Sequence, residues 1–173
     1  LNMKFIITGG SGFLGSNISK KLIDEGHRVI SMDLKEPKIE GVEFIKVNLL
    51  NEIEKTDLLK NPDVYINLAG KLIFGRWTEE FKKLIRDTRV EGTKNLIKLF
   101  EDSDFRPKKL IQASAVGIYG DNGKEIINEN SSMGESFLSQ VAIDWEKESQ
   151  KVKKMDVDLT IIRNGHILGE GAL

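Results

Sequence analysis

The sequence of 173 residues has no cysteine, only three prolines and only two histidines. Without cysteine it forms neither disulfides nor thiolate metal sites, and no spacing of histidine and acidic residues is typical of a metal centre, so we expect no bound metal. Its 27 acidic and 26 basic residues leave a net charge of −1, which gives no reason to expect nucleic acid or an anionic membrane as a partner. No apolar run approaches the length of about 18 residues that a membrane-spanning helix needs. We therefore expect a cytoplasmic protein.

Glycine is well represented, with 16 residues. Hydrophobic residues at 39% and charged residues at 31% are typical of a globular protein. The length suits one domain with a sizeable core and is short for two. We expect residues 1–173 to form a single domain.

Residues 5–15 carry the most informative pattern in the chain. An apolar run passes through three glycines into a segment whose leucine and isoleucine residues recur every four positions, which predicts a buried strand, a tight turn and a helix. Gly9 allows the chain to reverse, Gly12 allows backbone to approach a pyrophosphate, and Gly15 allows the helix to pack closely on the sheet. Because the start of the helix presents unpaired N–H groups and a positive dipole end, the turn predicts a dinucleotide site.

The next strand, predicted over 28–32, ends at Asp33, which lies 18 residues after Gly15. That is close to the separation of about 20 residues at which a carboxylate accepts hydrogen bonds from the adenosine ribose. A carboxylate here repels the 2′-phosphate of NADP, whereas Lys35 could fold over such a phosphate. Because Asp33 is fixed by the strand and Lys35 is on a loop, we expect NAD to be preferred over NADP.

The rest of the chain alternates between strand and helix patterns. Further strands are predicted over 42–47, 64–70, 108–115 and 159–163. Helices are predicted over 51–59, 78–100 and 135–152, with acidic residues such as Glu146 on their solvent faces. This alternation predicts an α/β fold with a doubly wound parallel sheet, the Rossmann fold, in strand order 3-2-1-4-5-6.

In such a sheet, ligands bind beyond the carboxyl ends of the strands, where small residues leave room for them. The fourth predicted strand runs out into small residues there. The predicted cofactor-binding residues are Gly9, Gly12, Phe13, Leu14, Gly15, Asp33, Asn48, Leu49, Leu68, Ala69 and Gly70.

Several motifs together resemble the extended short-chain dehydrogenase/reductases, the family of the nucleotide-sugar epimerases. The matching stretches are residues 8–15, 67–70, 114–120 and 163–169. More narrowly, the chain is similar to an atypical branch of nucleoside-diphosphate-sugar epimerase-like, or cell-division-inhibitor-like, proteins. The stretches that carry this second resemblance are 76–80, 88–93, 137–141 and 144–146.

The resemblance implies an NAD(P)-binding domain of an epimerase/dehydratase-like protein, with a small-molecule substrate such as a sugar nucleotide. It also implies a smaller C-terminal substrate domain, which is absent from residues 1–173, so we expect this chain to be the N-terminal part of a longer protein. The alternative is a non-catalytic protein whose bound NAD(P) is structural or sensory.

The typical family uses a tyrosine, a lysine four residues later and a serine or threonine for proton transfer. In this chain the tyrosine and lysine positions fall near Leu138 and Ala142, which cannot transfer a proton. The hydroxyl position falls on Ala115, one residue after Ser114. The candidate catalytic residues are therefore Ser114 and Tyr119. The alternative for both is a hydrogen bond to loop backbone.

Overall fold

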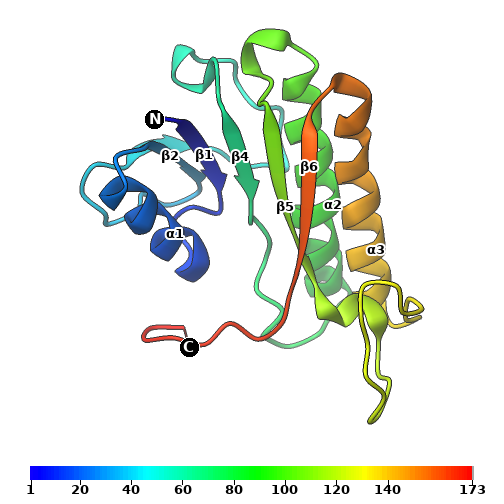
Figure 1. The fold of residues 1–173 in the computed structure, drawn as a ribbon. Helices are drawn as coiled ribbons and strands as arrows, with labels where there is room; N and C mark the ends of the chain where they lie inside the picture. The colour runs from blue at the N-terminus through cyan, green and yellow to red at the C-terminus, as the bar shows by residue number, and fades with distance from the viewer. Residues whose placement is uncertain (173) are drawn as a thin grey trace.

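The computed structural model describes residues 1–172 and contains one six-stranded sheet (Figure 1). The strands are β1 (Lys4–Thr8), β2 (Arg28–Asp33), β3 (Glu43–Lys46), β4 (Val64–Asn67), β5 (Lys109–Ala115) and β6 (Asp158–Asn164). Every neighbouring pair is parallel, and the order is β3-β2-β1-β4-β5-β6. The predicted fold class and strand order are confirmed.

Three α-helices and several short 3₁₀ turns connect the strands. The α-helices are α1 (Phe13–Asp24), α2 (Glu79–Phe100) and α3 (Phe137–Ser149), and the 3₁₀ segments are η1 (Asp57–Leu59), η2 (Ser103–Phe105), η3 (Val116–Tyr119) and η4 (Gln150–Met155). Helix α2 begins where the Thr78 hydroxyl accepts a bond from a first-turn N–H group, and Ser136 does the same for α3. Helix α1 has no such side-chain cap, because Gly12 occupies that position.

The helices cover the two faces of the sheet with separate hydrophobic clusters. On one face, α1 packs over side chains such as Ile7, Val29 and Ile66. On the other, α2 and η4 cover a larger cluster that includes Tyr65 and Phe100. In Figure 1, α2 and α3 lie side by side behind β5 and β6, and α1 lies on the β1 side. The carboxyl ends of β1 and β4 therefore meet the start of α1.

The predicted helix over 51–59 is wrong. Only Asp57–Leu59 is helical, and it is a single 3₁₀ turn. Ile53 and Leu59 anchor this segment in the core, with 5% and 0% of their surfaces exposed, and the chain between them runs over the surface without repeated helical contacts. The predicted helix over 135–152 is also shorter, because η4 replaces its last turn.

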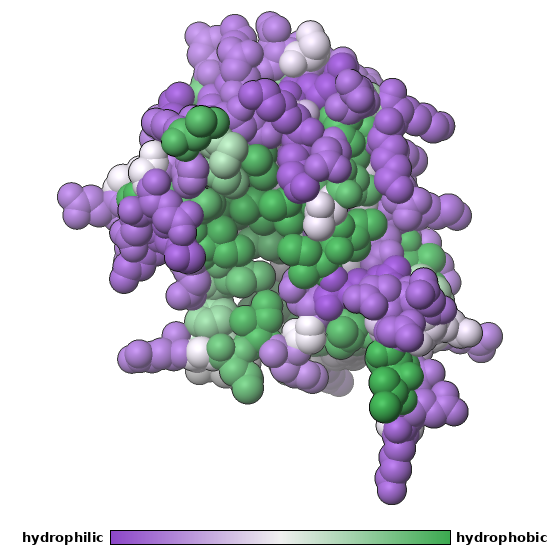
Figure 2. Space-filling view, in the orientation of Figure 1, coloured by the Kyte–Doolittle hydropathy of each residue, from purple (hydrophilic) through white to green (hydrophobic). Residues whose placement is uncertain are grey.

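Part of the sheet face on the α1 side is uncovered. Ile162 of β6 lies in register with Ala113 of β5 and is 46% exposed, and Ile111 is half-buried beside it. Figure 2 shows apolar residues gathered over β4, β5 and β6 next to α1. Within residues 1–172, no helix is long and apolar enough to span a bilayer.

Candidate functional site

The loop between β1 and α1 reverses at Gly9 as predicted, whereas Gly15 packs against the loop itself rather than against the sheet. Gly9 has φ +69°, and a Cβ there would lie 3.0 Å from Ala69 Cα, so this position requires glycine. A Cβ on Gly15 would lie 2.7 Å from Gly10 Cα and closer still to the Gly9 carbonyl oxygen. In contrast, a Cβ on Gly12 would meet only that carbonyl oxygen, at 3.3 Å. Gly12 therefore leaves an open surface, whereas Gly9 and Gly15 hold the loop against its neighbours.

The first turn of α1 presents unpaired donors to that open surface. Ser16 N–H donates to Gly12 O at 2.9 Å and begins the helical series. The N–H groups of Phe13, Leu14 and Gly15 have no acceptor among residues 1–172, and no acidic residue lies in this turn. A phosphate satisfies such donors and interacts favourably with the positive end of the helix dipole. The loop and first turn together fit a dinucleotide pyrophosphate.

Asp33 lies at the end of β2, beside the same loop. Its Oδ2 accepts from Ser11 N–H at 3.0 Å, and its Oδ1 accepts from Leu34 N–H at 2.6 Å. The Ser11 hydroxyl in turn donates to the carbonyl oxygen of Lys35. The carboxylate is therefore fixed at the rim of the loop, and each oxygen keeps capacity to accept another bond.

A chain of buried polar side chains fixes the carboxyl ends of β1, β4 and β5. Thr8 Oγ1 donates to Asn67 Oδ1 at 2.5 Å. Asn67 Nδ2 donates to Thr93 Oγ1 at 2.9 Å and to Gln112 Oε1 at 2.8 Å. Trp145 Nε1 of α3 also donates to Thr93 Oγ1, at 3.0 Å. The sequence analysis missed Thr93 and Gln112, because a lone polar residue within an apolar strand or helix face does not reveal its distant partner.

The segment after β4 is attached directly to the end of β1. Leu68 N–H donates to Thr8 O at 3.2 Å, and Ala69 N–H contacts Thr8 Oγ1 at 3.3 Å. Gly70 follows at the surface. Leu68 and Ala69 therefore lie next to the glycine loop.

Asn48 and Leu49 lie further along the sheet, after β3. Asn48 is exposed, and its Oδ1 accepts from Leu50 N–H at 3.0 Å. The Leu49 side chain is 9% exposed and packs in the core, and its carbonyl oxygen accepts from Asn95. Leu49 is therefore part of the core next to the site, whereas Asn48 faces solvent.

The candidate catalytic residues Ser114 and Tyr119 both lie beside one buried ion pair. Arg163 of β6 donates to both carboxylate oxygens of Glu146 and, through Nη1, to Tyr119 Oη at 2.7 Å. Burial is the largest influence on Glu146 and opposes its ionisation. The bond from Arg163, the adjacent Ser114 hydroxyl and the charge of Arg163 together outweigh it and hold the pKa of Glu146 below its ordinary value.

This arrangement corrects the expected solvent position of Glu146, which is only 5% exposed. Its partner Arg163 is 17 residues away, so helical spacing alone could not reveal the pair. Ser114 adjoins the carboxylate, yet its buried Oγ has no partner at hydrogen-bonding geometry within residues 1–172. Ser114 of β5 thus lies beside Glu146, and Tyr119 of η3 is bonded to Arg163, so both candidates contact the same ion pair.

Leu138 and Ala142 lie on α3. Leu138 is half-buried, and Ala142 is 4% exposed and packs against Ile118 and Tyr119. Neither side chain can donate or accept a proton.

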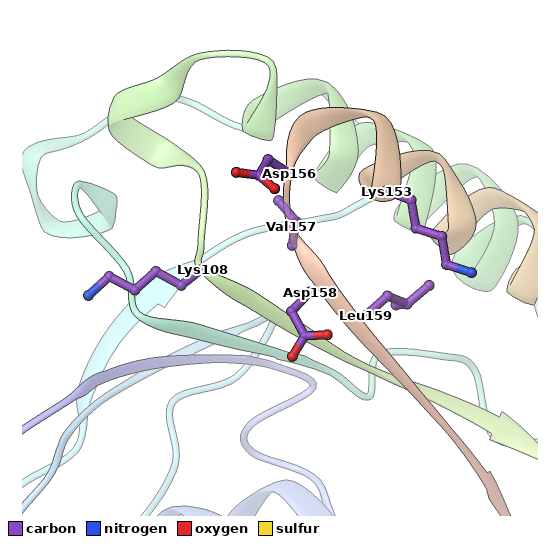
Figure 3. Close-up of a pocket in the computed structure, with 6 residues that line it drawn as sticks. All are labelled: Lys108, Lys153, Asp156, Val157, Asp158 and Leu159. Atoms are coloured by element: carbon purple, nitrogen blue, oxygen red, sulfur yellow. The ribbon is translucent and has the colours of Figure 1, made fainter.

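Two shallow hollows lie at opposite ends of the sheet. One, of about 410 Å³, borders the glycine loop between the start of α1 and the segment after β6; it is lined by Phe13, Leu14, Asn17, Ile167, Leu168, Gly169 and Glu170. The other, of about 340 Å³, lies at the amino ends of β5 and β6 and is lined by Lys108, Lys153, Asp156, Val157, Asp158 and Leu159 (Figure 3). Because ligands of open parallel sheets bind at the carboxyl ends, the first hollow adjoins the site and the second does not.

Comparison with known proteins agrees with this geometry. The sequence pattern of the NAD dependent epimerase/dehydratase family matches residues 5–172. YfhF, an epimerase family protein of Bacillus subtilis, is 41% identical over 174 residues, which cover 99% of this chain and 57% of YfhF. The chain thus spans a little over half the length of this relative.

Two solved structures are also similar. The nucleoside-diphosphate sugar epimerase of Corynebacterium glutamicum is 34% identical with a TM-score of 0.74, over 94% of this chain and 34% of that one. The human epimerase family protein SDR39U1, solved with NADPH, is 25% identical with a TM-score of 0.80, over 98% of this chain and 56% of that one. The match over nearly all residues, together with the glycine loop and the open start of α1, shows that this chain is an NAD(P)-binding domain of the NAD dependent epimerase/dehydratase family.

Proposed function

We propose that residues 1–173 are the dinucleotide-binding part of a longer cytoplasmic oxidoreductase-family protein that acts on a sugar nucleotide or a similar polar alcohol or carbonyl compound. The observation that carries the proposal is the glycine loop, whose open side adjoins three N–H groups of α1 that have no acceptor within residues 1–172. The similarity to a nucleoside-diphosphate sugar epimerase supports the substrate class.

When bound, NAD(P) supplies the capacity to accept and return a hydride. The residues of this chain would hold it as follows: the first-turn N–H groups of α1 bind its phosphates, and Asp33 accepts from a ribose hydroxyl. A proton must also leave or enter the substrate oxygen when hydride moves. Tyr119 is the first candidate for this proton transfer. Arg163 donates a hydrogen bond to the Tyr119 oxygen, so the phenolic proton stays available for the substrate. Ser114 is the second candidate for the proton.

A second candidate function is a non-catalytic protein with structural or sensory NAD(P). It is favoured by the apolar side chains of Leu138 and Ala142 and by the burial of Ser114, which is 3% exposed. The two functions share the cofactor site and differ only in turnover.

The test uses the full-length protein with NAD and, as substrates, UDP-glucose and UDP-glucuronic acid, with products separated by chromatography. Ser114→Ala, Tyr119→Phe and the double variant are compared with Ser132→Ala, an exposed control. Loss of turnover in both single variants, with cofactor affinity retained, supports the proposed proton role. Full activity of the double variant removes both residues from the mechanism. Cofactor binding without turnover of any sugar nucleotide favours the non-catalytic candidate.

A further inference from the structure

The loop that connects η3 to α3 contains the sequence Asp121-Asn122-Gly123, and it extends away from the sheet (Figure 1). An asparagine followed by glycine readily loses its side-chain amide, because glycine has no side chain to hinder attack by its backbone nitrogen on the amide carbon. The chain has two such dipeptides, Asn122-Gly123 and Asn164-Gly165. Their surroundings differ.

The backbone at Asn122 is free to move. Asn122 lies outside any helix or strand, in a turn where its carbonyl oxygen accepts from Glu125 N–H at 3.1 Å. Gly123 is exposed and has φ +60°. A Cβ placed on it would meet no atom of residues 1–172 within 4 Å beyond its chain neighbours. The Gly123 nitrogen can therefore approach the Asn122 side chain without displacing packed atoms.

Asp121 lies at the nitrogen that must react. Its Oδ1 accepts from Gly123 N–H at 2.9 Å. The attack requires this N–H group to lose its proton, and a carboxylate within hydrogen-bonding distance of a proton is placed to act as its general base. The loop therefore holds the amide, the attacking nitrogen and a base on three consecutive residues.

Asn164 provides the contrast within the same chain. It is half-buried, as Asn122 is, but it is the last residue of β6 and lies in register with Ala115 of β5. Its backbone is therefore part of a parallel ladder, and rotation toward its own side chain would disrupt that pairing. The same dipeptide should react slowly there.

We propose that Asn122 is a deamidation site at which Asp121 takes the proton from Gly123 N–H. The Gly123 nitrogen bonds to Cγ of Asn122, the Cγ–Nδ2 bond breaks, and the proton leaves with Nδ2 as ammonia. Water then opens the succinimide ring to aspartate or isoaspartate. The net change is uptake of water and release of ammonia, so the reaction needs no oxidant or reductant.

The conversion removes a donor that supports η3. Asn122 Nδ2 donates to Tyr119 O at 2.9 Å and lies 3.5 Å from Gly120 O. A carboxylate in its place has no proton to share and sets negative charge against two carbonyl oxygens. Because the Tyr119 hydroxyl bonds to Arg163, a loosened turn also disturbs the buried ion pair. The modified chain should melt at a lower temperature.

The first test is incubation of the full-length protein in mildly alkaline buffer, followed by digestion, chromatography and mass spectrometry of the peptides. Asn122 should convert at least about tenfold faster than Asn164, a barrier difference of about 1.4 kcal/mol. Asp121→Ala should slow conversion at Asn122 and leave Asn164 unchanged. Glu125→Ala is the matched control, because it removes an acidic side chain from the same exposed loop.

The second test compares melting temperatures. Asn122→Asp reproduces one product and should lower the melting temperature, whereas Asn130→Asp adds the same charge at an exposed residue of the same loop and should not. Absence of conversion at Asn122, or an equal rate at Asn164, would overturn the proposal. An unchanged Asn122 rate in folded Asp121→Ala would overturn the role of the carboxylate, and equal melting temperatures of the two aspartate variants would overturn the effect on η3.

Discussion

Arg163 and Glu146 form a two-point ion pair that joins the end of β6 to α3, with Nε–Oε1 at 2.8 Å and Nη2–Oε2 at 3.0 Å. Only 19% of the Arg163 side chain and 7% of the Glu146 side chain are exposed. The same guanidinium lies over the Tyr119 ring and donates to its hydroxyl. The pair therefore fixes three elements around the end of β5.

Removal of one partner should destabilise the fold strongly. We expect Glu146→Gln to lower the free energy of unfolding by about 3 kcal/mol, because it leaves the buried guanidinium without a counter-charge. Urea unfolding measures this loss. Lys21→Ala is the control, since both side chains of its pair with Glu25 are exposed and the pair should contribute little to stability. Similar losses in both variants would contradict the prediction.

The same pair should make stability depend on acid. Because the fold lowers the pKa of Glu146 below its ordinary 4.5, its contribution is fully present above pH 4.5 and is lost as the pH falls through the folded value. We expect the stability difference between wild type and Glu146→Gln to shrink on acidification. Chemical unfolding over a pH series measures it; a constant difference would show that the carboxylate charge plays no part.

The two glycines at the start of α1 should respond differently to substitution. Gly12→Val places a branched side chain on the open side of the loop, so cofactor affinity should fall at least tenfold, about 1.4 kcal/mol, in a chain that still folds. Gly15→Ala places a methyl group against the loop backbone. This variant should therefore lower the melting temperature in addition to the cofactor affinity. Calorimetry and thermal unfolding separate the two effects. Unchanged affinity in folded Gly12→Val would refute the dinucleotide site.

Asp33 should favour NAD over NADP. Like charges about 4 Å apart repel by roughly 4 kcal/mol at an effective dielectric constant near 20, and backbone bonds hold Asp33 at the rim of the loop. We expect tighter binding of NAD, and Asp33→Asn should raise NADP affinity while keeping the Ser11 bond. The measurement is the dissociation constant of NAD and of NADP, for wild type and Asp33→Asn, at one salt concentration. Equal or tighter NADP binding by the wild type would show that Lys35 outweighs Asp33.

Tyr65 offers a stabilising change far from the site. Its hydroxyl is buried without a partner in residues 1–172, and burial raises its pKa. Tyr65→Phe should therefore stabilise the chain by about 1 kcal/mol, because an unsatisfied buried hydroxyl is removed. Tyr119→Phe, which removes a bonded hydroxyl, should act in the opposite direction. A lower melting temperature for Tyr65→Phe would indicate an unseen partner for its hydroxyl.

Local sequence patterns predicted the strands and the glycine loop because those features depend on near neighbours. Glycine permits the positive φ of Gly9, and Gly12 has no side chain with which to cap α1. The alternation of strands and helices then restricted the topology to a parallel order with right-handed crossovers.

The features that sequence analysis missed depend on distant partners or on tertiary anchoring. Glu146 and Arg163 meet only after the sheet has formed, and Thr93 meets Asn67 across 26 residues. The segment over 51–59 looked helical by length and polarity, yet Ile53 enters the core without a continuous apolar face beside it.

The two tryptophans of the chain lie in opposite environments, since Trp145 is 5% exposed and Trp77 is 42% exposed. Trp145 should therefore emit fluorescence at shorter wavelengths than Trp77. Its indole N–H bonds to Thr93, which also accepts from Asn67, and the Arg89 cation lies over its ring. Any change in the position of Arg89 changes the electric field at that ring. The short-wavelength part of the emission spectrum therefore reports on the packing of α3 against α2 at the carboxyl end of β4.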